Sequence, residues 1–246
     1  MTSDISPLEP VAPDDRHARA TRPVKLEFSE KYDQGHAYQY FLIHHHGLWR
    51  RISNWREQRL ARNALRAAGN PASVLDIPCG TGRFWELLAA SGSMLFAGDF
   101  SAGMLDTASA FRKPDIRRRF NVFRATAFSL PLADNSVECV FCVRFLHHIG
   151  KDEDRLALFR ELARVSSKTV VVSLWVDGNW QALRRKKLED QRGRTRDRYQ
   201  NRFVASRAGI ERLFREAGLE IAEHRDFLRF YSMWRFYVLR KPGAVC

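Results

Sequence analysis

The sequence predicts an α/β fold in which helices cross over between the strands of a parallel sheet. From residue 71 onward, short apolar runs alternate with stretches of helical periodicity. That alternation is typical of right-handed strand–helix–strand units. Hydrophobic residues make up 45% of the 246-residue chain, so it can bury a full core as one main domain.

The expected strands and helices follow one another along this main domain. Short apolar runs predict buried strands at residues 73–78, 93–100, 122–128, 137–144 and 168–176. Periodic stretches between them predict helices at residues 82–91, 101–113 and 151–165. A further helix and strand are expected within residues 207–228, and residues 233–241 close the chain as a last strand.

The segment before residue 71 has a different composition. Residues 1–26 are rich in Pro, Asp, Arg and Ala and lack periodicity, so we expect a disordered tail. Residues 27–70 carry apolar and aromatic residues near helical spacing and end at a Gly-Asn-Pro stop signal. They predict an N-terminal helical cap of one or two helices, which leaves residues 71–246 as the main domain.

The chain is strongly basic, with 41 Lys and Arg against 28 Asp and Glu and a formal charge of +13. An anionic partner and a merely solvated, Arg-rich surface both explain that charge. The basic residues are densest in an insert at residues 183–203, which either is a solvated excursion or binds an anionic lipid, phosphorylated glycolipid, RNA or nucleotide. Its candidate contacts are Arg184, Arg185, Lys186, Lys187, Arg192, Arg194, Arg196 and Arg198.

Cysteine usage and hydropathy indicate a cytoplasmic protein, at most peripheral to the inner membrane. Four cysteines in a chain this long do not form a disulfide framework. No apolar run approaches the roughly 20 residues that span a bilayer, and the N-terminus lacks a signal-peptide pattern. Cys139 and Cys142 have CxxC spacing but lie on an expected strand, where they face opposite sides. We therefore expect no metal site.

The turn at Gly80 and Gly82 follows the first expected strand, where open parallel sheets bind ligands. A phosphate-binding P-loop is excluded because Arg83, rather than Lys, follows the glycines. A dinucleotide site is disfavoured because Trp85 stands where a third glycine is needed. Asp76 at the strand end would repel a pyrophosphate and attract a cationic group, so the turn predicts a zwitterionic or cationic ligand.

The stretch VLDIPCGTGRF, residues 74–84, resembles the signature of class I S-adenosylmethionine-dependent methyltransferases, particularly the group similar to ubiquinone-biosynthesis methyltransferases. Three more stretches resemble that family in order and spacing: FAGDFSAGML, ATAFSLPLADNSVECVFCVRFLHHI and EKYDQGHAYQY. The resemblance implies a Rossmann-like, seven-stranded, mostly parallel sheet with an antiparallel last strand. It also implies S-adenosylmethionine as the cofactor.

The resemblance assigns a set of cofactor-binding residues. Asp99 would hold the ribose hydroxyls, and Thr126 stands where many relatives have an Asp for the adenine amino group. A neutral hydroxyl accepts more weakly than a carboxylate, so this position departs from the family. The full set is Asp76, Pro78, Gly80, Gly82, Asp99, Phe100, Thr126, Ala127, Phe128 and Val143.

Arg144 and His148 are the candidate catalytic residues, since Arg144 ends the fourth expected strand, His148 follows it, and both would face the acceptor. Arg144 could orient an anionic acceptor or instead form a salt bridge with a nearby acid. Of His147 and His148, one could serve as a base, or one packs while the other faces solvent. The aromatic group Tyr32, His36, Tyr38 and Tyr40 either roofs the pocket or packs on the core.

The leading hypothesis is methyl transfer to an anionic small molecule or a lipid-linked saccharide, with nucleic acid disfavoured as the acceptor. Methyltransferases that act on base amino groups often carry Asn or Asp followed by Pro-Pro and an aromatic residue, whereas this chain reads VRFL at residues 143–146. The rival hypothesis is a regulatory or binding module of the same fold, whose basic insert binds an anionic ligand.

Overall fold

The computed structural model describes residues 48–191 and 202–243. The expected tail, most of the expected cap and the middle of the basic insert lie outside those ranges. Within them, no helix combines the length and apolar character needed to cross a bilayer.

A seven-stranded sheet forms the centre of the molecule, in the order β3-β2-β1-β4-β5-β7-β6. Its strands are β1 Ser73–Asp76, β2 Met94–Asp99, β3 Phe120–Arg124, β4 Val137–Cys142, β5 Ser166–Trp175, β6 Glu220–Asp226 and β7 Trp234–Arg240. The pairs among β1 to β5 are all parallel, and β7 runs antiparallel to both β5 and β6. The predicted sheet, with its antiparallel last strand, is confirmed.

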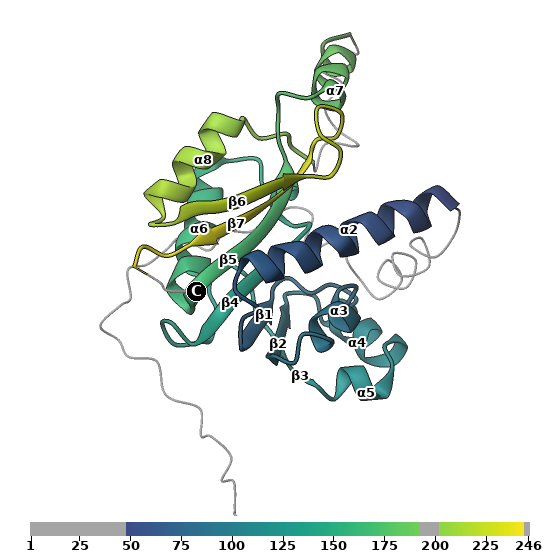
Figure 1. Ribbon diagram of the computed structural model, residues 1–246, viewed down its shortest axis with the longest axis vertical. Helices are drawn as coiled ribbons and strands as arrows, with labels where there is room; N and C mark the ends of the chain where they lie inside the picture. Colours follow the sequence, from purple (N-terminus) through teal and green to yellow (C-terminus); the bar gives the residue numbers. More distant parts are fainter. Residues whose placement is uncertain (1–47, 192–201, 244–246) are drawn as a thin grey trace, which may run out of the picture.

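Helices cover both faces of the sheet (Figure 1). They are α2 Leu48–Ala67, α3 Trp85–Ala89, α4 Ala102–Phe111, α5 Pro114–Arg117, the 3-10 turn η3 Leu146–His148, α6 Asp152–Val165, α7 Trp180–Gln191 and α8 Arg207–Glu216. One apolar core joins the sheet to α2, α3 and α4, and the other joins it to α6 and α8. The inner parallel strands β1, β4 and β5 therefore have both faces buried, as expected for crossover connections, whereas three of the five residues of the edge strand β3 are exposed.

Cys139 and Cys142 show this two-sided burial directly. Both side chains are fully buried in β4, but Cys139 lies in the core under α2 and Cys142 lies in the core under α6. The strand alternation expected from the sequence separates the two sulfur atoms to opposite faces, so they cannot share a metal ion.

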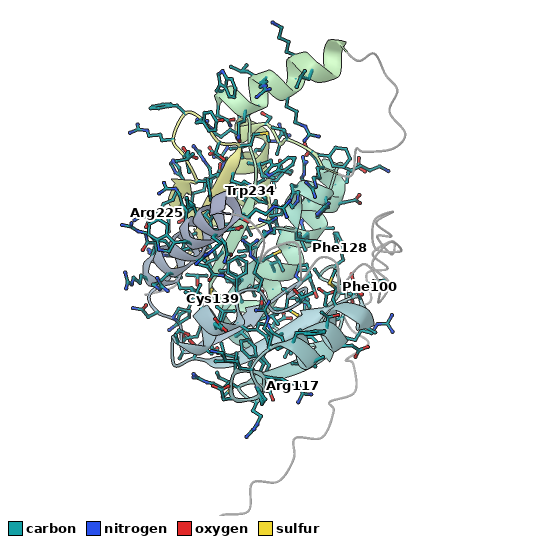
Figure 2. All side chains as sticks on the ribbon, turned by 90° about the vertical axis from the view of Figure 1, so that its right-hand side faces the viewer. Phe100, Arg117, Phe128, Cys139, Arg225 and Trp234 are labelled. Atoms are coloured by element: carbon teal, nitrogen blue, oxygen red, sulfur yellow. The ribbon has the colours of Figure 1, made fainter. Side chains whose placement is uncertain are left out.

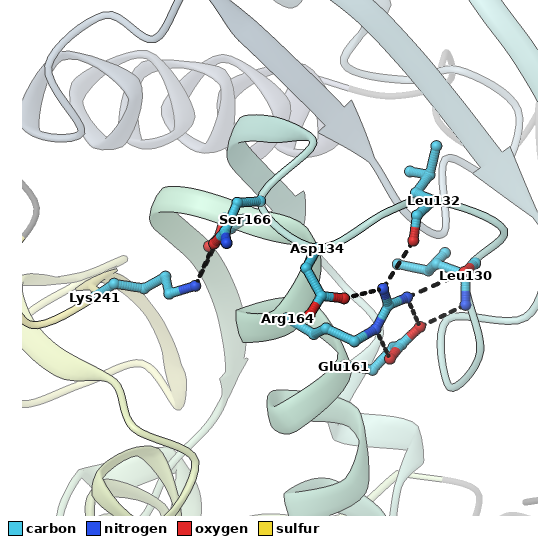
Figure 3. Close-up of polar contacts among 8 residues, drawn as sticks. Leu130, Leu132, Asp134, Glu161, Arg164, Ser166 and Lys241 are labelled. Carbon is cyan, nitrogen blue, oxygen red and sulfur yellow. Dashed lines mark hydrogen bonds and ion pairs between the residues drawn. The ribbon is translucent and has the colours of Figure 1, made fainter. Parts of the chain in front are cut away.

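α6 forms where the sequence predicts it, because acidic residues occupy its first turn and a basic residue its last. Near its end, Arg164 donates hydrogen bonds to Glu161, Asp134 and two backbone carbonyls of the loop before β4 (Figure 3). Glu161 in turn accepts the Leu130 N–H at 2.6 Å. These contacts raise the pKa of the Arg164 guanidinium and fix the loop that leads from β3 to β4.

Two elements differ most from their expected bounds. β3 begins and ends earlier than residues 122–128, because residues 126–129 form a tight turn closed by the Ser129 N–H to the Thr126 carbonyl at 3.2 Å. α3 is only five residues long instead of spanning residues 82–91, because Gly82 has a left-handed φ of +68° that a helix cannot contain.

Candidate functional site

Asp76 and Asp99 end adjacent parallel strands, so they meet at the carboxyl edge of the sheet. The carboxylate of Asp99 accepts the Gly80 N–H at 2.8 Å and the Ser101 N–H at 2.9 Å. Asp99 is thus tied directly to the glycine turn and to the N-cap of α4. The Ala125 N–H donates to the Asp99 carbonyl at 3.1 Å, which brings the end of β3 to the same place.

Gly80 keeps an open space at this edge. Its φ is +54°, and a Cβ built at this position would have no heavy atom within 4 Å. The turn around it is fixed by the Cys79 N–H to the Gly98 carbonyl at 2.8 Å and by Arg112 Nε to the Thr81 carbonyl at 2.8 Å. The backbone at Gly80 is therefore both rigid and approachable, as a ligand-binding turn requires.

Gly82 has a different role from the one its position suggests. A Cβ at Gly82 would lie 2.7 Å from the ring of Trp85, which is fully buried and stacked on Phe120 with a centroid distance of 4.5 Å. The missing side chain makes room for the first residue of α3. Of the two glycines expected at a ligand, only Gly80 faces open space.

Asp76 is buried more deeply than an edge position suggests, with 2% of its surface exposed. Burial and the nearby charge of Asp99 raise its pKa well above the usual range. The indole of Trp85 opposes that shift, yet neither its Nε1 nor Asp76 Oδ2 has a hydrogen-bond partner within the described residues. A buried carboxylate oxygen without a donor is costly, so this atom suits a ligand that brings one.

Burial also raises the pKa of Asp99, to about 6, although the N–H groups of Ser101 and Gly80 lower it. The carboxylate form of Asp99 therefore predominates at neutral pH. It offers more lone pairs than its two backbone donors use, so it retains capacity to accept hydroxyl hydrogens.

The residues expected around an adenine lie on one side of the molecule. Thr126 and Phe128 belong to the tight turn after β3, where Thr126 Oγ1 accepts the Phe128 N–H at 3.4 Å. Phe100 is half exposed next to Asp99, and Figure 2 shows Phe100 and Phe128 on the same side of the view. Ala127 and Val143 are buried, and Pro78 is half-buried after a cis peptide bond.

Arg144 forms a salt bridge with a nearby acid, which is one of the two roles that the sequence suggests for it. Its Nη1 lies 3.2 and 3.1 Å from the two carboxylate oxygens of Glu57 in α2, and its guanidinium stands over Trp234 at 5.1 Å. Glu57, which is 4% exposed, also accepts Arg83 Nη2 at 2.6 Å. One carboxylate thus joins α2 to the glycine turn and to the end of β4, and the role of Arg144 toward an acceptor stays a prediction.

His147 and His148 differ in burial, as one of the two alternatives for this pair predicts. His147 is buried against Trp175 and Trp234, with ring centroids 5.1 and 5.0 Å away. Its pKa is well below the usual range because of burial and because of the neighbouring His148, Arg144, Arg202 and Arg185 side chains, so it is neutral at pH 7. His148 is partly exposed, and its role as a base stays a prediction.

The basic insert begins within a helix. α7 covers its first part, where Arg184, Lys186 and Lys187 are exposed. Arg185 instead stands over Trp175 at 5.0 Å and donates to the Arg202 carbonyl at 2.9 Å. The remaining candidates of the insert, Arg192, Arg194, Arg196 and Arg198, lie outside the described residues, as do Tyr32, His36, Tyr38 and Tyr40.

Glu57 lies at this site although the sequence pattern did not predict it there. It is the one acidic residue of α2, among six arginines. A lone acid on a basic helix is the signal that could have indicated a buried ion pair, since an unpaired charge is rarely buried.

Comparison with known proteins adds to this geometry. The model of a family described as a methyltransferase domain matches residues 75–172, which run from β1 through most of β5. The chain contains a class I methyltransferase domain. The matched range includes the glycine turn, both edge aspartates and the turn after β3, so the family expected from the sequence is confirmed.

Two curated relatives of the methyltransferase domain have the same name. A demethylmenaquinone methyltransferase of Renibacterium salmoninarum is 34% identical over 117 residues, which are 48% of this chain and 46% of the relative. A protein of that name from Corynebacterium urealyticum is 37% identical over 112 residues, which are 46% of this chain and 43% of the relative. The chain spans about half the length of the curated relatives that it matches.

Solved structures share the fold of the methyltransferase domain. The magnesium protoporphyrin IX methyltransferase of Synechocystis PCC 6803, crystallised with bound SAH, superposes with a TM-score of 0.68 at 17% identity over 86% of this chain and 97% of that chain. A SAM-dependent methyltransferase of Thermotoga maritima gives a TM-score of 0.58 at 19% identity over 87% of this chain and 96% of that chain.

Proposed function

We propose that this protein transfers a methyl group from S-adenosylmethionine to a small-molecule acceptor. The observation that carries the proposal is the Asp99 carboxylate, which is fixed to the open glycine turn by the Gly80 N–H at the carboxyl edge of the sheet. An acid held in this way suits the two hydroxyls of a ribose. The neighbouring orphan oxygen of Asp76 suits a cationic or hydrogen-donating group of the same ligand.

The residues of the edge fit an adenosyl group in further respects. Phe100 and Phe128 offer aromatic faces beside the turn, and Thr126 offers a hydroxyl. When bound, the sulfonium of S-adenosylmethionine supplies an activated methyl group. The work left to the protein is to orient the acceptor and to exclude water, and orientation of this kind lowers a barrier by about 7–11 kcal/mol.

The acceptor that we propose is anionic, either a small molecule or a lipid-linked saccharide. Arg83 and Arg144 both contact the carboxylate of Glu57, so two guanidinium groups lie next to the end of β4. A guanidinium at this place can orient a carboxylate or phosphate group of the acceptor. In this proposal His148, which also follows β4, takes a proton from the acceptor if its nucleophile is protonated.

We also propose that the protein works at an anionic membrane surface, with a cytoplasmic location. α7 stands beside the loop between β6 and β7 at the top of Figure 1. Trp180 stacks on Tyr231 at 5.2 Å, while Leu183 is 66% and Phe230 is 73% exposed. Arg184, Lys186 and Lys187 are exposed on the same helix. Exposed aromatic and aliphatic side chains next to cations favour the interface of an anionic bilayer.

Methyl-labelled donor tests the function. The protein is incubated with labelled S-adenosylmethionine and with separated lipid, small-molecule, RNA and protein extracts. We expect label in the lipid or small-molecule fraction, abolished by Asp99→Asn and retained by Asp106→Asn, since Asp106 is an exposed acid on α4. Label in RNA alone would contradict the acceptor class. Binding of polyanions without any methyl transfer would support the regulatory alternative.

Vesicle flotation tests the membrane contact. We expect the protein to float with phosphatidylglycerol vesicles and to stay behind with phosphatidylcholine vesicles. Phe230→Ser should weaken flotation, whereas Met94→Ser should leave it unchanged, because Met94 is equally apolar and 62% exposed at the opposite edge of the sheet. Equal loss with both variants would contradict the proposed surface.

A further inference from the structure

Two adjoining cavities lie where α2 meets β6, away from the glycine turn. The larger, of about 500 Å³, is lined by α2, the end of β6 and the loop that follows it. The smaller, of about 200 Å³, shares His224, Asp226 and Arg229 with the larger one and extends toward the end of β5. The larger volume falls within the range of small-molecule sites, roughly 300–1,000 Å³.

The walls of the larger cavity are strongly basic. Arg56, Arg59, Arg225 and Arg229 line it, together with His224 and a single carboxylate, Asp226. That carboxylate is already neutralised, because Arg235 donates to its two oxygens at 2.6 and 3.0 Å. Arg225 pairs with Glu223 at the surface. In the described part of the chain, Arg56, Arg59 and Arg229 have no carboxylate partner.

Aromatic rings hold these three guanidinium groups in place. Arg59 stands over Trp55 at 5.6 Å, Arg229 over Phe230 at 4.7 Å and Arg56 over Phe227 at 5.8 Å. Arg56 Nε also donates to the Phe227 carbonyl. Stacking on a ring restricts the side chain while it leaves guanidinium N–H groups at the edge available to an acceptor. Less entropy is therefore lost when an anion binds.

We propose that this cavity is a binding site for a phosphate-bearing small molecule. Three like charges around one cavity repel each other, and a multiply charged anion converts that repulsion into attraction. A phosphate or pyrophosphate group offers enough oxygens for several guanidinium forks at once, whereas one carboxylate offers two oxygens. The class of ligand is therefore a phosphorylated compound rather than a monocarboxylate.

The proposed site is separate from the methyl-donor edge and does not depend on the proposed methyl transfer. Asp76 lies in β1 and Asp226 in β6, with β4, β5 and β7 between them. Figure 2 shows Arg225 on the opposite side of the view from Phe100 and Phe128. The two sites still share α2, where Glu57 faces the glycine turn and the adjacent Arg56 lines the cavity.

Calorimetric titration with inorganic pyrophosphate at low salt tests the proposal. We expect one site per chain, weakened at least about tenfold in the double variant Arg59→Ala/Arg229→Ala, because each lost charged hydrogen bond has a strong effect. Both side chains are exposed, so the fold is retained. The matched control, Arg212→Ala/Arg215→Ala, removes the same charge from exposed positions on α8 and should bind as the wild type does.

Vesicle flotation with phosphatidic acid distinguishes a lipid headgroup from a soluble phosphate as the source of the ligand. If Arg59→Ala/Arg229→Ala loses both vesicle and pyrophosphate binding, the cavity takes a lipid phosphate. If it loses pyrophosphate binding alone, the ligand is a soluble phosphorylated compound. Absence of pyrophosphate binding, or an equal loss in the α8 control, would overturn the site, since binding would then reflect net charge only. Methyl transfer is not measured, so these results do not depend on it.

Discussion

The carboxyl edge of the sheet has two halves with opposite chemistry. At the ends of β1 and β2, two buried aspartates stand beside a glycine turn with open space. At the ends of β5 and β6 and the start of β7, arginines stand over aromatic rings around a cavity. A class I fold fixes the first half because it must hold the donor, while the second half is free to differ between acceptors and effectors. We therefore expect the arginine-lined half to be the part in which this chain is specialised.

The half of the edge that holds Asp76 and Asp99 is called the acidic half here. It should lose ligand affinity most when the carboxylate of Asp99 is removed. Asp99→Asn keeps the size of the side chain but removes the charge that accepts ribose hydroxyls, so we expect S-adenosylhomocysteine to bind about 100-fold more weakly. Isothermal titration calorimetry measures the change. Asp106→Asn serves as the control, and a loss below about threefold in Asp99→Asn would place the donor elsewhere.

The junction between the halves should depend on Glu57. Glu57→Gln leaves Arg83 and Arg144 without their shared carboxylate, so we expect the free energy of unfolding to fall by about 2–4 kcal/mol. Urea denaturation provides the value. Glu216→Gln removes an exposed partner of Arg212 and should cost below about 0.5 kcal/mol. Similar values for the two variants would show that the buried pair does not join the halves.

Substitutions of the two glycines of the turn should affect different properties. Substitution of Gly82 should lower the stability of the protein most, and substitution of Gly80 should weaken ligand binding. Gly82→Ala places a methyl group against Trp85 in a left-handed conformation and should destabilise the protein by about 2–3 kcal/mol. Gly80→Ala has the conformational cost alone, about 1 kcal/mol, but its methyl group enters the open space beside Asp99. At a temperature where both variants are folded, we expect only the Gly80 variant to bind S-adenosylhomocysteine about tenfold more weakly. The opposite pattern would exchange the two roles.

Affinity at the acidic half should also depend on pH. The pKa of Asp99 is raised to about 6 by burial, and a ribose favours the carboxylate form. Protonation therefore competes with the ligand, so affinity should be constant above that value and fall by about tenfold per pH unit below it. Calorimetry between pH 5 and about 8 follows the change. A flat profile in that range would mean that Asp99 does not titrate in contact with the ligand.

Sequence patterns predicted the parts of the molecule that local chemistry determines. The strand ends at Asp76 and Asp99, the turn at Gly80 and the opposite burial of Cys139 and Cys142 follow from periodicity and spacing. These features depend on residues that are close in sequence or lie at equivalent ends of parallel strands.

Features that depend on distant residues could not be predicted in the same way. Gly82 serves the packing of Trp85, which only the path of the turn reveals. Arg144 meets Glu57 across 87 positions of the chain, and the basic cavity joins Arg59 in α2 to Arg229 after β6. Pairings of this range require the sheet order to be known.

A crystal structure of the protein grown with S-adenosylhomocysteine tests the central claim most directly. We predict the ribose at the Asp99 carboxylate, with the backbone of Gly80 against the ligand and the adenine near Phe128. Density for the ligand in the arginine-lined cavity, or anywhere other than the ends of β1 and β2, would contradict the account.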